Sequence, residues 1–496
     1  MDKIGKMSKK SSLKNNFFFN FISQILTLLI PLITTPYLAR IFHESGNGQV
    51  AFANNILTYF TMIANFGFAI YGQREIAKYQ DNKYMRSKTF WEIILIRLFL
   101  VLFSISILFA TLSVNLYGES YTLLILIGSI QVFGIIFDVN FYYQGQEDFK
   151  SIAIRTLVLR LICLIFIFIF VKKETDMWIY ILIFSLSVVL SNLVMWPKLR
   201  KSITKISFKE LEYKKHAFPS FIIFLSIMAA TVFGTLNNLM IGYLCPNPDY
   251  ENGNYFQGMK LNQTILMLVI VIDSIMVARN SYDHANGDDE KVKEHINFAC
   301  DYVWHIGIPL LIGMCVLSNS ISSWFLGEGY DEVPMILNIL SVRFITSALG
   351  CVFGNQLFIA IGKEKYNIIA HIITTITILI LNFIFIPLYG AIGAAITCAI
   401  AESVDCLVLL IIAIRTKKVS LKKILPMTIK PLLASSLMFV VIFFMNKYIT
   451  YSVWSFLLIA LVGLVIYIAA CFIIKDSFFI NLYNRYVKTF FKRNKQ

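Results

Sequence analysis

Runs of about 20 apolar residues recur along the whole chain, and each is long enough to cross the hydrocarbon core of a bilayer as a helix. Inside hydrocarbon a chain must satisfy its own backbone N–H and C=O groups, and a long apolar run does this as a helix. The composition agrees, because 57% of the 496 residues are hydrophobic and only 15% are charged. The sequence therefore predicts an all-α polytopic membrane protein.

The apolar runs divide the chain into fourteen predicted transmembrane helices. The longest basic linker, 198–216, follows the sixth helix, so the seventh helix starts from the same side as the first. Two six-helix lobes of equal orientation are parallel repeats. We expect an N-lobe at 1–216 with helices 1–6 and a C-lobe at 217–414 with helices 7–12. Helices 13 and 14 and a basic cytoplasmic tail would occupy 415–496. The predicted helices are 17–38, 49–70, 89–112, 120–143, 151–171, 177–197, 217–244, 255–278, 299–317, 334–361, 367–388, 389–414, 427–447 and 451–474.

The net charge of +15 is distributed by side of the membrane. When Arg155 and Lys447, at helix edges, are counted with the adjoining loops, 35 of the 44 Lys and Arg residues fall on the side of the two termini. Only 4 fall on the other side, and 5 lie within helices. Cytoplasmic loops hold the excess of basic residues. We therefore expect a multi-pass protein of the inner, cytoplasmic membrane with both termini in the cytoplasm, and no nucleic acid as a partner.

The residue types that usually carry metal or redox chemistry show no motif. The eight cysteines have no CxxC spacing, and the six histidines have no HExxH arrangement. We expect no metal site, no cofactor and no catalytic residue, so the protein is not predicted to be an enzyme.

Ionisable side chains within predicted helices are the candidate functional residues, since each is costly in the bilayer and usually faces a cavity or a partner. The cations Arg97, Lys260 and Arg343 are candidates for binding an anionic substrate. The acids Glu402, Asp405 and Asp138 are candidates for coupling transport to an ion, because burial raises the pKa of a carboxylate. The alternative is that such residues form buried ion pairs that serve structure only, for example Arg343 with Glu402.

Five stretches in a fixed order resemble bacterial oligosaccharide flippases, the Wzx-type members of the multidrug/oligosaccharidyl-lipid/polysaccharide exporter superfamily. The resemblance extends from about residue 13 to 475. The stretches are "PYLARIF" (36–42), "FGFAIYGQREIAKYQDN" (66–82), "DVNFYYQGQEDFK" (138–150), "NQLFIAIGKEKYN" (355–367) and "NFIFIPLYGAIGAAI" (382–396).

The resemblance implies a substrate and a mechanism. The substrate would be an oligosaccharide on undecaprenyl diphosphate, moved from the inner to the outer leaflet by alternating access for surface polysaccharide biosynthesis, whether capsule, O-antigen or another polymer. Membrane lipids would surround the protein, and a glycan polymerase of the same pathway is a further candidate partner. Guanidinium groups bind diphosphate oxygens well. We therefore add Arg40, at the outer end of the first helix, and Arg74, at the inner end of the second, to the cationic site.

Two rival functions stay open at this point. A drug or metabolite exporter of the same superfamily would share the fold, although the "PYLAR" and "YGQREIA" stretches weigh against it. A membrane polysaccharide polymerase would usually carry a large outer loop, and the predicted outer loops are short.

The charge distribution predicts cytoplasmic loops at 71–88 and 198–216 and external loops at 245–254 and 318–333. Single cysteines placed in these loops can be labelled on intact cells with a membrane-impermeant reagent. We expect labelling at 245–254 and 318–333 only. Labelling at 71–88 without labelling at 245–254 would show the opposite orientation.

Overall fold

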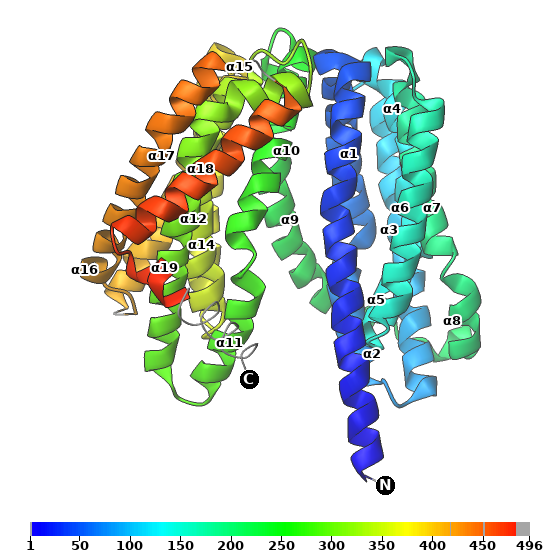
Figure 1. The fold of residues 1–496 in the computed structure, drawn as a ribbon. Helices are drawn as coiled ribbons and strands as arrows, with labels where there is room; N and C mark the ends of the chain where they lie inside the picture. The colour runs from blue at the N-terminus through cyan, green and yellow to red at the C-terminus, as the bar shows by residue number, and fades with distance from the viewer. Residues whose placement is uncertain (1, 417, 450–451, 483–496) are drawn as a thin grey trace. The chain divides into compact units, whose positions relative to one another are not determined.

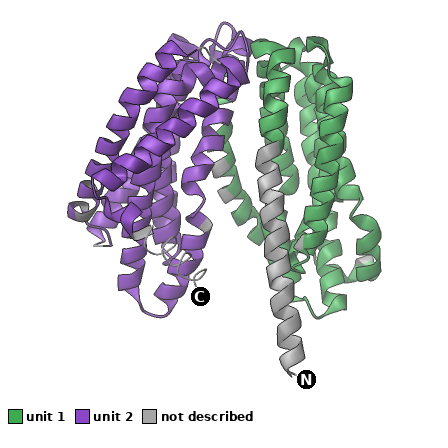
Figure 2. Ribbon diagram, viewed as in Figure 1, with its two compact units in different colours: residues 1–242 green, residues 243–496 purple. Residues whose placement is uncertain are grey.

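A computed structural model describes residues 2–416, 418–449 and 452–482, with the backbone alone for 2–29 and a few single positions. Helices and short connections make up this described part, which contains no strand (Figure 1). The chain divides into two compact units, residues 1–242 and 243–496 (Figure 2). The predicted division into two six-helix lobes at residue 216 concerns repeated helix order rather than compact units, and it stays a prediction.

The first unit contains the helices up to most of α9. Its three short helices, α2, α5 and α8, contribute side chains to one buried apolar cluster together with α3. The helices are α1 (Asp2–Asn65), α2 (Phe68–Lys78), α3 (Lys83–Ser113), α4 (Glu119–Gly134), α5 (Asn140–Gly145), α6 (Phe149–Phe170), α7 (Met177–Leu193), α8 (Trp196–Ser202) and α9 (Lys214–Leu244).

The second unit is built from the remaining helices. Its α13 and α14 are separated by a bend and lead into a π-helical segment, Val352–Ile359. The helices are α10 (Pro248–Ile270), α11 (Asp273–Ala285), α12 (Asp289–Phe325), α13 (Val333–Leu340), α14 (Arg343–Cys351), α15 (Lys365–Arg415), α16 (Leu421–Ile424), α17 (Ile429–Tyr448), α18 (Val453–Ile473) and α19 (Ser477–Leu482).

Two very long helices each contain one sharp break. In α1 the break is at His43, which has a φ of 51°. In α15 it is at Gly390, which has a φ of 54° and a ψ of −129°. A Cβ at Gly390 would lie 2.2 Å from Oε2 of Glu251, and the same oxygen accepts a hydrogen bond from the N–H of Ala391 at 2.6 Å. Glycine is therefore required at this break both for its backbone angles and for the approach of Glu251.

Apolar side chains lie both inside and outside the units. The interior of the first unit includes Phe52 and Leu57, which are 1% exposed. Many large apolar side chains point outward instead, such as Phe99 at 68% and Ile473 at 78% exposure. An apolar exterior of this extent suits hydrocarbon rather than water.

The membrane-protein prediction is confirmed at the level of fold class. Within the described residues, nine helices are long and apolar enough to cross a membrane, or ten if the bent pair Val333–Leu340 and Arg343–Ile359 is one span. The finer count of fourteen helices stays a prediction.

Candidate functional site

Arg343 and Glu402 form a buried ion pair in the second unit. Arg343 is the first residue of α14 and is 6% exposed, and Glu402 on α15 is 7% exposed. Nη2 of Arg343 lies 2.8 Å from Oε1 of Glu402, and Nε donates to Oε2 at 2.9 Å. Two parallel contacts between guanidinium and carboxylate are the strongest geometry for such a pair. Arg343 and Glu402 therefore form the buried ion pair that the sequence analysis gave as the alternative to a substrate-binding site.

The remaining donors of Arg343 are directed to α10. Nη1 donates to Oδ1 of Asn262 at 2.9 Å, and Nη2 donates to Oε1 of Gln263 at 3.3 Å. One arginine thus ties together α10, α14 and α15. Its role in binding substrate stays a prediction, and a ligand that reached it would have to compete with these partners.

Arg97 and Asp138 form the corresponding arrangement in the first unit. The Arg97 side chain on α3 is 0% exposed, and Nη1 donates to the backbone oxygen of Asp138. Nη2 donates to Oδ1 of Asn65 at 3.2 Å, and the guanidinium lies 5.0 Å from the ring centroid of Phe141. The Asp138 carboxylate is 3.9 Å from Nη1 and accepts the N–H of Asn140 at 2.9 Å.

The other predicted site residues lie separately. Arg40 and Arg74 are exposed, and Lys260 on α10 is partly buried with Nζ 5.6 Å from the ring centroid of Phe256. Asp405 on α15 lies 3.0 Å from Nδ1 of His371 and accepts the Thr374 hydroxyl at 3.1 Å. The structure therefore brings predicted site residues together in two pairs, Arg343–Glu402, which the sequence had suggested, and Arg97–Asp138, which it had not, each within one unit.

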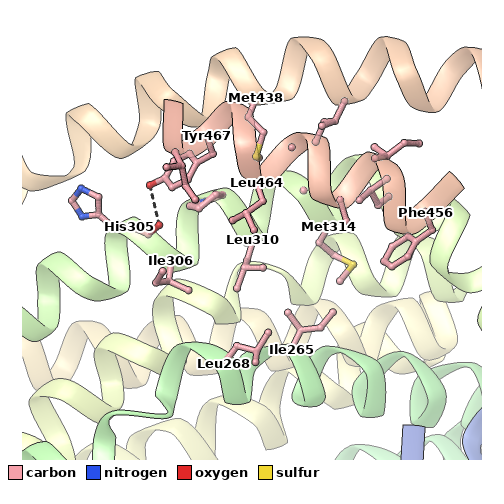
Figure 3. A pocket seen from close by; sticks show the side chains of 18 of the residues that line it. Ile265, Leu268, His305, Ile306, Leu310, Met314, Met438, Phe456, Leu464 and Tyr467 are labelled. Carbon is pink, nitrogen blue, oxygen red and sulfur yellow. Dashed lines mark hydrogen bonds between the residues drawn. The ribbon is translucent and has the colours of Figure 1, made fainter. Parts of the chain in front are cut away.

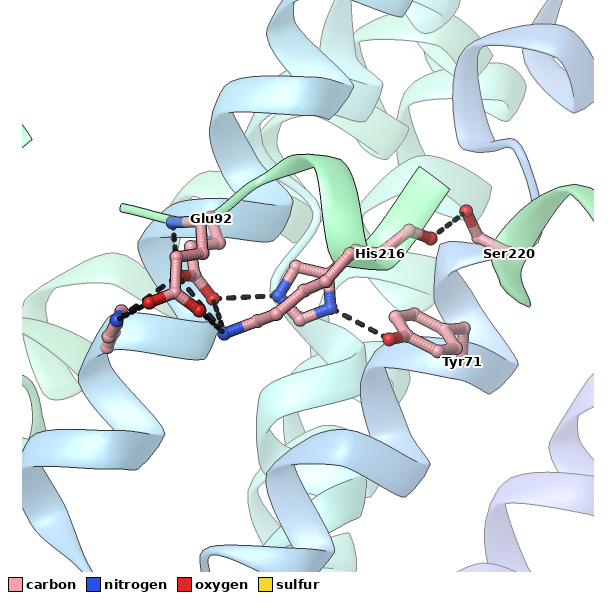
Figure 4. A network of polar contacts seen from close by, with 7 residues as sticks. Tyr71, Glu92, His216 and Ser220 are labelled. Atoms are coloured by element: carbon pink, nitrogen blue, oxygen red, sulfur yellow. Dashed lines mark hydrogen bonds and ion pairs between the residues drawn. The ribbon is translucent and has the colours of Figure 1, made fainter. Parts of the chain in front are cut away.

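A buried network at Glu92 was missed from the sequence (Figure 4). Glu92 on α3 is 0% exposed, and Oε2 lies 2.7 Å from Nε2 of His216, which is 1% exposed. Nδ1 of His216 is 2.8 Å from the Tyr71 hydroxyl. Oε1 of Glu92 accepts the N–H of Glu212 at 2.7 Å, and Nζ of Lys215 is 3.2 Å from Oε2. The one sequence feature that could have indicated this network is Glu92 itself, an acid in the first turn of the predicted helix 89–112.

An apolar cavity of ≈ 450 Å³ lies in the second unit (Figure 3). Leu310 and Met314 on α12 and Leu464 on α18 point into it, and His305 and Tyr467 form its polar wall. The Tyr467 hydroxyl donates to the backbone oxygen of His305 at 2.9 Å. Such a lining can hold an apolar chain and offers little to a charged group.

Two acids meet beside the break in α15. Glu332 precedes α13 and is hydrogen-bonded to Glu251, the residue that caps Ala391. Burial raises the pKa of Glu332 to about 7, and the Glu251 carboxylate adds to this effect. Among the described residues as a whole, no three His, Cys, Asp or Glu side chains are placed to hold a metal ion.

Comparison with known proteins identifies the family. Residues 13–277, just over half of the chain, match a family model described as polysaccharide biosynthesis protein. The chain belongs to the polysaccharide biosynthesis protein family. A second family model, described as lipid II flippase MurJ, matches residues 254–462. The resemblance to oligosaccharide flippases inferred from the five stretches is thereby confirmed.

The chain matches individual relatives over nearly the whole length of each relative. A candidate O-antigen transporter of Shigella dysenteriae is 25% identical over 399 residues, covering 79% of this chain and 97% of the relative. The capsular polysaccharide biosynthesis protein CapF of Staphylococcus aureus is 24% identical over 414 residues, covering 78% and 96%. The solved structure of the lipid II flippase MurJ, inward closed, has a TM-score of 0.74 at 18% identity, covering 93% of this chain and 99% of that one. The last likeness establishes the fold.

The Arg343–Glu402 ion pair predicts how stability responds to substitution. Glu402→Ala should lower the free energy of unfolding by about 3–5 kcal/mol, because Arg343 would keep a buried charge without its carboxylate. The double variant Arg343→Met, Glu402→Leu should recover most of the loss. Thermal unfolding in detergent measures both effects, with Glu75→Ala, which removes an exposed pair with Lys78, as the control. Wild-type stability of Glu402→Ala would contradict the assignment.

The Glu332 pair predicts a dependence of stability on pH. The folded protein holds the Glu332 proton up to a pH of about 7, whereas the unfolded chain releases it near the ordinary pKa of 4.5. Stability should therefore fall as the pH rises between these two values and level off above the upper one. Glu332→Gln should remove this part of the pH profile of the unfolding midpoint. Glu328→Gln, in the same loop between α12 and α13, is the control, and an unchanged profile in Glu332→Gln would contradict the assignment.

Proposed function

We propose that this protein is a flippase for a lipid-linked oligosaccharide. It moves an oligosaccharide repeat unit on undecaprenyl diphosphate from the inner to the outer leaflet by alternating access, for the biosynthesis of a surface polysaccharide. Membership of the polysaccharide biosynthesis protein family carries this proposal. The names of the relatives, an O-antigen transporter and a capsular polysaccharide protein, support the substrate class. They do not decide whether the polymer is O-antigen or capsule.

The helix boundaries support a count of fourteen spans. The broken helices α1 and α15 have 64 and 51 residues, so each is long enough for two spans of about 20 residues. The pairs α4–α5, α7–α8, α10–α11 and α13–α14 each coincide with one predicted span, and α3, α6, α9, α12, α17 and α18 supply one each. With the excess of basic residues at the termini and alternate loops, we propose that both termini are cytoplasmic in the inner membrane.

The cationic residues divide into two roles in this proposal. Arg97 and Arg343 are buried and hold helices together through their partners. Arg40 and Arg74 are exposed, and the amine of Lys260 faces an aromatic ring rather than a carboxylate. We propose that Arg40 and Arg74 make the first and last contacts with the diphosphate because they are exposed, and that the partly buried Lys260 contacts it between them.

Among the candidates for ion coupling, the surroundings favour Asp405. Glu402 and Asp138 each lie beside an arginine, so each already has a cationic partner within the protein. The partners of Asp405 are His371 and Thr374, and histidine is the side chain best suited to pass a proton near neutral pH. The apolar cavity beside His305 can take part of a polyprenyl chain.

The proposal predicts that the protein restores glycan export in cells lacking their resident flippase. Arg74→Ala should slow transfer of the lipid-linked oligosaccharide by about tenfold, equivalent to about 1.4 kcal/mol, and Arg74→Lys should retain part of the rate because it keeps the charge. Lys78→Ala, on the same helix and paired with Glu75, should export normally. The measurement is the fraction of lipid-linked glycan accessible from the outer face. If the wild-type chain leaves all of it in the inner leaflet, the proposed function is wrong.

A further inference from the structure

The linker between the predicted six-helix lobes is held along its length to the first unit. We call residues 202–216 the strap. Near its start, the N–H of Thr204 donates to Oγ of Ser87 at 3.0 Å, and Nε1 of Trp91 donates to the Thr204 backbone oxygen at 3.1 Å. Farther along, Nζ of Lys88 lies 3.1 Å from Oε1 of Glu212. The strap therefore follows the first turns of α3 and is not a free tether.

The strap ends in the buried network at Glu92. The carboxylate accepts hydrogen bonds from the N–H of Glu212 and from His216, and it lies 3.2 Å from the amine of Lys215 (Figure 4). In the neutral imidazole, Nε2–H donates to Glu92 and Nδ1 accepts the hydroxyl proton of Tyr71. Detaching the strap would break all of these contacts to the Glu92 carboxylate together, so the strap is held at this end by several interactions.

Contacts with the first unit continue along α9 as far as its outer end. The rings of Phe66 and Phe224 are stacked with centroids 5.0 Å apart, and a Cβ at Gly67 would lie 2.7 Å from the Ser220 backbone oxygen. Farther along, the hydroxyl groups of Tyr59 and Thr235 are 2.5 Å apart.

The chain passes from the first unit to the second within a few residues. A Cβ at Gly242 would lie 2.3 Å from the ring of Phe52, so this glycine is packed on the first unit. Cys245 already belongs to the second unit, where its Sγ lies 3.9 Å from the Ile386 backbone oxygen. Between α9 and α10 only Cys245, Pro246 and Asn247 lie outside a helix.

We infer that α9 is mechanically part of the first unit and that the joint between the moving units is the segment 243–247. The inference rests on the proposed alternating-access function. A rearrangement that separated α9 from the first unit would break the Glu92–His216–Tyr71 network, unstack Phe66 from Phe224 and uncover Phe52. Bending at 243–247 breaks none of these contacts. The seventh predicted span, although it begins the predicted C-lobe, therefore moves with the first six.

Hydrogen exchange of the full chain in detergent tests the strap independently of transport. The amides of Thr204 and Glu212, which donate to Ser87 and Glu92, should exchange at least about tenfold more slowly than the amides of Cys245 and Asn247, which lie outside a helix, since protection follows the free energy of local opening. His216→Ala should speed exchange in the strap without changing exchange at 243–247. Faster exchange in the wild-type strap than at 243–247 would overturn the inference.

Cross-linking tests the joint during transport. In an active background without native cysteines, Tyr59→Cys and Thr235→Cys are joined by a short bifunctional thiol reagent. The cross-linked protein in vesicles should flip lipid-linked oligosaccharide within about twofold of the unlinked protein, because the linked residues never separate. The two single-cysteine variants treated with the same reagent are the controls. A tenfold loss confined to the cross-linked protein would overturn the inference. A wild-type chain that flips nothing would instead count against the proposed function. Hydrogen exchange would in that case still test whether the strap is fixed to the first unit.

Discussion

The structure depends on one requirement, that a charge inside an apolar helical assembly must meet an opposite charge or a set of hydrogen-bond partners. Glu92, Arg97, Arg343 and Glu402 are all 7% exposed or less, and each is held by groups from other helices or, for Glu92, from the strap as well. The energetic reason is the cost of leaving any one of them unpaired, which exceeds what most single apolar contacts contribute. These residues therefore determine which helices stay adjacent, and the apolar side chains fill the space around them.

The same requirement separates residues that hold the protein together from residues that are available to a substrate. Arg343 is engaged by Glu402, Asn262 and Gln263, and Arg97 is engaged by Asn65 and by the backbone of Asp138. An anionic ligand gains little from Arg343, whose donors are already occupied, and Arg97 is fully buried with both of its terminal nitrogens engaged. Exposed cations near helix ends, such as Arg74, keep their binding capacity, and this difference is the basis for assigning the diphosphate contacts in the proposed flippase.

A flippase must move one group of helices against another without exposing paired charges. The distribution of contacts meets this condition if α9 remains with the first unit and the chain bends where α9 gives way to α10. Because the strap is fixed through Glu92, its length and its basic residues do not make it a hinge. The moving units of such a protein can therefore differ by a whole helix from the six-helix lobes that its sequence predicts, without any change in topology.

The sequence by itself determined the fold class, since long apolar runs have only one way to satisfy their backbones in hydrocarbon, and five motifs in order were enough to indicate the family. It also singled out Arg343 and Glu402, because ionisable residues within apolar runs are visible in one dimension. It left open whether they face a cavity or each other, since the choice depends on which helices pack together. Only the tertiary structure decided that. It also decided that Glu92, 124 positions from His216, forms the centre of a buried network, because contacts over such separations arise from packing between helices and leave no periodic signal in the chain.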